Sequence, residues 1–114
     1  MSHTHFFQAL SDETRLRIVM LLAREDELSV CELVHALQLS QPKVSRHLAY
    51  LRDAGVAGVR RQAQWVHYRL LETMEPWKLE IIRTAMRGLE EDERFREDFT
   101  RLQNMEGRPD RPAA

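Results

Sequence analysis

Residues 39–55 are the stretch of the chain that most restricts its fold. Apolar residues recur there at the spacing of a single helix face: Val44, Leu48 and Leu51. Ser40 is a favoured N-cap and Gly55 a favoured stop, so the stretch predicts one amphipathic helix of about three turns. Such a helix packs one side on a core and leaves the other side for solvent or a partner.

The outer face of this predicted helix combines small residues with hydrogen-bond donors. It carries Pro42, Ser45, Arg46 and Ala49, with Gln41 and Arg52 on one flank and Lys43 on the other. Small side chains allow close approach to a surface, and the donors reach outward. A helix that enters the major groove of DNA, which is about 12 Å wide, needs both properties. An ordinary solvated helix also fits this pattern, so the choice between the two interpretations depends on the rest of the sequence.

Charge is unevenly distributed along the 114 residues, although the formal net charge is only −1. Residues 40–69 carry six basic side chains against one acidic one, a balance of +5. Residues 1–39 have three basic and six acidic side chains, and residues 70–114 have eight and eleven, so each balance is −3. Positive charge concentrated in the middle third indicates a surface that meets phosphate groups.

Helical patterns precede the central helix. Residues 5–10 and about 12–24 predict two helices. Ser29 and Glu32 have the spacing of a capping box at the start of a short third helix. A helix, a tight turn and a second helix with a basic outer face predict a helix-turn-helix.

Two β-favouring runs follow the central helix, 56–61 and 65–70, around a turn at residues 62–64. A hairpin in this place is a wing, whose tip reaches an adjacent groove while its arginines meet phosphates. The predicted DNA-contacting residues are Gln41, Lys43, Ser45, Arg46, His47, Arg52, Arg60, Arg61, Gln62 and Gln64. For His47 we expect packing against the protein or a phosphate contact rather than a metal site.

A further helix begins near Pro76 and carries a narrow apolar stripe of Leu79, Ile82, Met86 and Leu89. Core packing is one explanation. We expect instead a dimer contact, with Phe6 and Phe7 nearby. The acidic run 90–93 interrupts the stripe, which predicts a bend before a last short helix.

These elements predict an α+β fold, a winged helix-turn-helix that is mostly helical with one β-hairpin. The length predicts a single domain, over residues 1–105, followed by a disordered tail at 106–114 that contains Pro109 and Pro112. We expect no membrane span and no secretory signal, because no apolar run approaches 18 residues and no basic-then-apolar leader is present. The sequence shows no glycine-rich phosphate loop and no Ser/His/Asp pattern, so we expect no enzyme.

Four stretches together resemble the ArsR (ArsR/SmtB) family of bacterial winged-helix repressors: Ala9–Ile18, Glu27–Leu33, Ser40–Leu48 and Gly55–Leu70. The resemblance extends roughly from Phe6 to Leu89. It implies a cytoplasmic homodimer, built from the first and the post-wing helices, on a palindromic DNA operator. Members of the family are typically released from DNA by a metal ion, a metalloid or a redox event.

Within this family the chain most resembles the arsenic-responsive repressors, which usually have Cys-Val-Cys before the recognition helix. The corresponding residues are Ser29, Val30 and Cys31, so one of the two cysteines is absent. Arsenite and antimonite favour about three thiolates, whereas two copies of this chain supply two. Cys31 is therefore either an inducer ligand for As(III) or Sb(III), or a redox switch, or a structural residue.

A weaker alternative is a mixed nitrogen–sulfur site for zinc-like ions, in which His3 and His5 approach Cys31 across a dimer. The zinc-sensing relatives carry Asp/His pairs in the post-wing helix, and residues 77–89 contain neither residue type. The overall prediction is a DNA-binding transcriptional repressor released by a thiol-directed inducer. The alternative is a winged-helix protein-interaction module, which has no need of concentrated positive charge.

Overall fold

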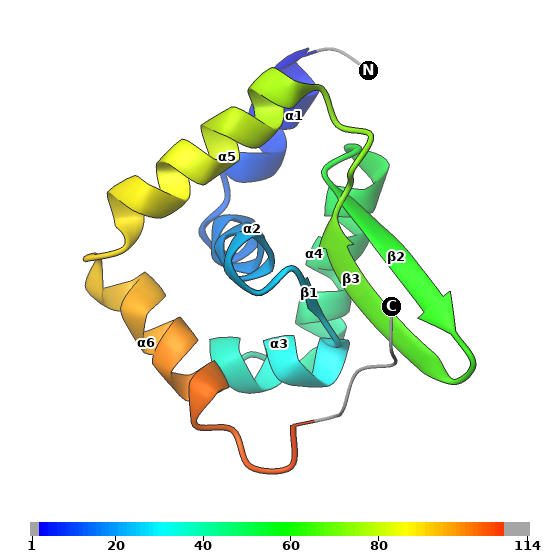
Figure 1. Cartoon of the computed structure of the whole chain (residues 1–114), viewed down its shortest axis with the longest axis vertical. Helices are drawn as coiled ribbons and strands as arrows, with labels where there is room; N and C mark the ends of the chain where they lie inside the picture. Colours follow the sequence, from blue (N-terminus) through cyan, green and yellow to red (C-terminus); the bar gives the residue numbers. More distant parts are fainter. Residues whose placement is uncertain (1–2, 109–114) are drawn as a thin grey trace.

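The computed structural model describes residues 3–108, which form six helices and one three-stranded sheet. Figure 1 shows helix α2 near the centre, with the other elements arranged around it. The elements are α1 (His3–Leu10), α2 (Glu13–Glu25), β1 (Glu27–Leu28), α3 (Val30–Leu37), α4 (Gln41–Asp53), β2 (Ala57–Gln62), β3 (Trp65–Leu70), α5 (Pro76–Leu89) and α6 (Glu93–Gln103). The predicted α+β winged helix-turn-helix is confirmed.

Helix α2 forms the centre of the core because its apolar residues point in several directions. Ile18 and Val19 are fully buried, and Leu22 is 1% exposed. The helix begins at Asp12, whose carboxylate accepts the Arg15 backbone N–H at 3.0 Å. This cap satisfies one of the amide groups that lack a partner in the first turn.

Helices α3 and α4 form the predicted helix-turn-helix, each with the predicted cap. Ser29 and Glu32 make the capping box of α3, and Ser40 accepts the Lys43 N–H at the start of α4. The core side of α4 is also as predicted, with no exposed surface at Val44, Leu48 and Leu51.

The wing is the antiparallel pair β2–β3, in which Gln62 pairs with Trp65. The turn therefore consists of two residues, Ala63 and Gln64, rather than the predicted three, and Ala63 has a φ of 54°. The short strand β1 pairs with β3 and completes the sheet in the order β1-β3-β2. Glu27, the last of three consecutive acidic residues, lies in β1.

Helix α5 packs on α2, and α6 packs on α3 after the predicted bend. Ile82 of α5 and Leu102 of α6 are fully buried. The apolar stripe of α5 therefore serves, at least at Ile82, as core of a single chain. No helix in the described part of the chain is long and apolar enough to span a membrane.

Arginine and aspartate side chains hold α6 against α2 and α3. Arg17 of α2 donates two hydrogen bonds to Asp98 of α6, at 2.8 and 2.7 Å, and a third to the Leu37 carbonyl at 3.0 Å. Arg101 donates to the Ala36 carbonyl at 2.7 Å and to Asp98 at 2.8 Å. Hydrogen bonding to Asp98 raises the pKa of Arg17 above its ordinary value, so the buried guanidinium stays charged.

The described end of the chain is attached to α3. Arg108 donates to Glu32 at 2.6 Å and to Glu25 at 3.1 Å, and Glu32 is fully buried. The arginine of this ion pair lies within residues 106–108, the first part of the predicted tail. Residues 109–114 lie outside the described part.

Candidate nucleic-acid interface

The outer face of α4 presents donors that the protein itself does not use. Gln41, Ser45 and Arg46 are exposed. Within residues 3–108, their side chains make no hydrogen bond and no ion pair. Pro42 and Ala49 lie on the same exposed face and keep it flat. This face is free to meet a partner that offers acceptors.

The structure brings Arg52 and Arg61 together, although they are distant in sequence. Arg52 of α4 and Arg61 of β2 line the same open groove between the recognition helix and the wing, with Ala49, Gly58 and Val59 among the other lining residues. Both arginines are on the surface. Two cations line this groove, together with the acidic Asp53. The two cations suit a phosphate backbone that passes between helix and wing.

Arg60 has a different environment from Arg61 because successive strand residues point to opposite faces. Its guanidinium forms a two-pronged ion pair with Glu27 of β1, at 3.0 and 2.5 Å, and also donates to Gln62 at 2.7 Å. Hydrogen bonding to Glu27 raises the pKa of Arg60. Arg60 thus joins the wing to β1, a contact that the sequence did not predict. Gln64 remains exposed at the tip.

His47 lies at the edge of the recognition face, in contact with α2. Its Nδ1 is 3.4 Å from Nη1 of Arg15 and 3.9 Å from the Asp12 carboxylate. Burial lowers its pKa, and the charges of Arg15, Arg46 and Lys43 lower it further, while Asp12 opposes them. A guanidinium only donates, so a hydrogen bond between these two groups has Nδ1 as its acceptor. His47 thus contacts Arg15 of α2 while it lies beside the recognition face.

His67 of β3 occupies an interior position. It is 1% exposed, and its ring stacks against Trp65 with centroids 5.7 Å apart. Both ring nitrogens lack a hydrogen-bond partner among the described residues. His67 therefore lies on the buried side of β3 rather than at the interface.

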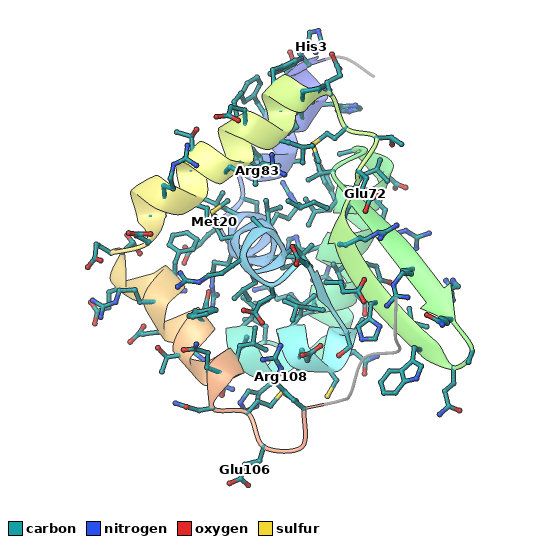
Figure 2. The ribbon with its side chains drawn as sticks, viewed as in Figure 1. His3, Met20, Glu72, Arg83, Glu106 and Arg108 are labelled. Atoms are coloured by element: carbon teal, nitrogen blue, oxygen red, sulfur yellow. The ribbon has the colours of Figure 1, made fainter. Side chains whose placement is uncertain are left out.

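Cys31 lies exposed in the first turn of α3. Figure 2 shows His3 at one end of the molecule and Arg108, which is bonded to Glu32 of α3, near the other. The His3 ring packs against Trp77, at 5.3 Å between centroids. Among residues 3–108, no group of three or more His, Cys, Asp or Glu side chains is arranged to hold a metal ion.

Two aromatic side chains are exposed where α1 meets α5. Phe7 is 49% exposed and Trp77 is 39% exposed, with ring centroids 6.3 Å apart. Two of the predicted dimer residues are buried within one chain: Phe6 is 2% exposed and Ile82 is 0% exposed. They therefore have no surface to offer a partner. Leu79, Met86 and Leu89 are partly buried against the core. Trp77 was not among the predicted residues.

Comparison with known proteins agrees with this geometry. Residues 12–58 match the family described as "Bacterial regulatory protein, arsR family". The arsenic resistance transcriptional regulator ArsR1 of Pseudomonas putida is 47% identical over 110 residues, which cover 95% of this chain and 83% of that protein. The chain belongs to the ArsR family. A further ArsR-family relative, the arsenical resistance operon repressor of Escherichia coli, is 53% identical over 81 residues, covering 71% of this chain and 69% of the relative.

Solved structures of the ArsR type share the fold. HlyU from Vibrio cholerae is similar with a TM-score of 0.65 and 38% identity, covering 74% of this chain and 87% of HlyU. The AntR antimony-specific transcriptional repressor has a TM-score of 0.61 and 30% identity, covering 75% of each chain. As a member of the ArsR family, the protein is a DNA-binding transcriptional repressor, and its relatives are regulators rather than enzymes.

Proposed function

We propose that this ArsR-family repressor acts in the cytoplasm as a homodimer on a palindromic operator. The observation that carries the proposal is the recognition face of α4, defined here as Gln41, Pro42, Ser45, Arg46 and Ala49. Its donors have no partner within the described residues. Arg46, Ser45 and Gln41 read base edges in the major groove, where arginine pairs well with guanine. Lys43, Arg52 and Arg61 bind phosphates, and the wing tip approaches the neighbouring groove.

The homodimer is proposed to form where α1 meets α5. Phe7 and Trp77 support this because two large exposed aromatic rings in contact are unusual on a monomer and favoured in interfaces. A two-fold axis there places two recognition helices about one turn of DNA apart.

The proposed inducer is a thiol-directed agent, arsenite, antimonite or an oxidant, that acts at Cys31. The support is the exposure of this thiol at the start of α3, where a thiol-directed agent can reach it. The names of the relatives refer to arsenic and antimony. Two chains supply two thiolates, so a third ligand, such as a small-molecule thiol, completes the site for As(III). A ligand at Cys31 releases DNA only if it binds the DNA-free form more tightly.

The test is a gel shift with a duplex from the region upstream of the protein's own gene and a shuffled duplex of equal length. We expect preferential binding of the upstream duplex, and release by arsenite with glutathione or by peroxide. Cys31→Ser should bind without being released, whereas Met105→Leu, which removes a different sulfur atom, should behave as the parent.

Equal binding of both duplexes would contradict the operator and favour a protein-interaction module. Normal release of Cys31→Ser would show that the cysteine is structural and that the inducer binds elsewhere.

A further inference from the structure

Arg15 closes the C-terminal end of α1. Its Nε donates to the Ala9 carbonyl at 2.9 Å, and its Nη2 donates to the Gln8 carbonyl at 3.2 Å. Carbonyl groups in the last turn of a helix lack partners within the helix, and a cation there is favoured by the helix dipole. Arg15 therefore fixes the end of α1 to the start of α2.

The same guanidinium contacts the recognition helix. Its Cζ lies 3.9 Å from the centre of the Tyr50 ring, and its Nη1 lies 3.4 Å from Nδ1 of His47. His47 and Tyr50 are three residues apart, so they lie one above the other on the flank of α4 that borders the recognition face. Stacking over one ring and bonding to another restricts both the rotation and the tilt of this flank.

The middle of α1 packs against α5. The Trp77 ring contacts the rings of Phe6 and Phe7, with centroid distances of 5.8 and 6.3 Å. A continuous series of contacts thus runs from the proposed dimer surface through α1 and Arg15 to α4.

We infer that Arg15 is a positioning residue for DNA recognition, which sets the angle of α4 relative to α1 and so to the dimer axis. The inference rests on the proposed operator binding by a dimer. Bonds to base edges depend on the angle of α4, whereas phosphate contacts tolerate small rotations. Loss of Arg15 should therefore reduce operator binding more than binding to unrelated DNA.

The experiment compares Arg15→Gln with Arg24→Gln, a matched control on the same helix. Arg24 also stacks on an aromatic ring, that of Phe99 at 3.7 Å, but this ring belongs to α6. Dissociation constants are measured for the upstream and the shuffled duplex over a series of salt concentrations, below the melting temperature of every variant.

For Arg15→Gln we expect the preference for the upstream duplex to fall by roughly tenfold, with an unchanged salt slope. Arg24→Gln should retain the preference. Tyr50→Leu should reduce the preference as well, and adding it to Arg15→Gln should reduce it little further, because the two residues act as a unit.

A salt slope lower by about 0.9, with equal losses on both duplexes, would show that Arg15 binds a phosphate and would overturn the inference. Wild-type preference in Arg15→Gln would overturn it too, and leave the proposed operator intact. If the wild-type protein itself had no preference for the upstream duplex, the operator proposal would fail and the inference with it.

Discussion

The two helices of the helix-turn-helix differ in how their polar groups are used. Helix α3 is bonded to the rest of the protein at both ends: Glu32 in its first turn accepts from Arg108, and carbonyl groups in its last turn accept from Arg17 and Arg101. In α4, the donors of Ser45 and Arg46 have no partner among the described residues.

This difference separates support from recognition. A helix whose polar groups are bonded from several sides has a fixed orientation, and breaking those bonds costs stability. A helix whose donors are unpaired gains no stability from them, so they are available to a ligand. Substitutions of the residues that hold α3 should therefore change the free energy of unfolding, whereas substitutions of the unpaired donors of α4 should change DNA binding.

The largest effect on stability is expected for Asp98→Ala. This change leaves the guanidinium of Arg17, which is 5% exposed, without its ion pair. Removing one partner of a buried pair costs about 3–5 kcal/mol in the free energy of unfolding. Urea denaturation should show this loss, while Glu97→Ala, at an exposed position of α6, should stay within about 0.5 kcal/mol of the parent. Equal free energies of unfolding for the two variants would show that the Arg17–Asp98 pair does not stabilise the packing of α6 on α2.

Arg46→Ala should have the opposite profile. We expect a loss of about 1–3 kcal/mol in operator binding and a weaker sequence preference, with an unchanged free energy of unfolding. Arg61→Ala, in the wing, should weaken binding to all DNA alike and reduce the salt dependence. If Arg46→Ala reduced the affinity for operator DNA and for random DNA equally, the assignment of Arg46 to base reading would be wrong.

The sequence predicted the recognition side better than the supporting side, for a physical reason. Caps, apolar periodicity and exposed donors depend on residues close together in the chain, so Ser40 and Arg46 could be placed from spacing alone. The Arg17–Asp98 pair joins residues 81 positions apart. In the sequence of α6, Asp98 is three residues after Phe95 and four before Leu102, the spacing of a single helix face. No other feature of the sequence points to this pair.

The wing and the dimer surface show the same limit. The hairpin could be predicted from β-propensity. The pairing of Arg60 with Glu27 depends on β1, a strand of two residues that is too short to give a recognisable sequence pattern. The apolar stripe of α5 did not reveal whether Ile82 faces its own chain or a partner. Only the position of α2 decides this.

A smaller effect is expected where α3 meets the end of the chain. Arg108→Ala removes the 2.6 Å hydrogen bond from Arg108 to the buried carboxylate of Glu32. The carboxylate still accepts the hydrogen bond from the Ser29 N–H at 2.9 Å. Because Glu32 keeps its bond from the Ser29 N–H, the expected loss is about 1–2 kcal/mol in thermal or urea unfolding. Arg111→Ala is the control near the same end of the chain. A loss no larger than that of the control would mean that α3 does not need this support.

The smallest predicted effect concerns His47, the contact between α2 and α4. Its pKa is lowered by burial and by Arg15, Arg46 and Lys43, against the opposing charge of Asp12. A base whose pKa is lower in the folded state than in the unfolded state destabilises the fold when it is protonated. The contribution is thus complete above the ordinary value of 6.5 and is lost as pH falls below it toward the lowered pKa.

The experiment is urea unfolding of the parent and of His47→Gln between pH 8 and pH 5, a range above the ordinary pKa values of carboxylates. The parent should lose stability toward the acidic end more steeply than the variant, because glutamine keeps a polar side chain but takes up no proton. The slope depends on the protons bound by each state, so the other histidines cancel in the difference between the two proteins. Parallel pH profiles would show that His47 titrates alike in both states. The contact between Arg15 and a neutral His47 would then contribute nothing to holding α4 on α2.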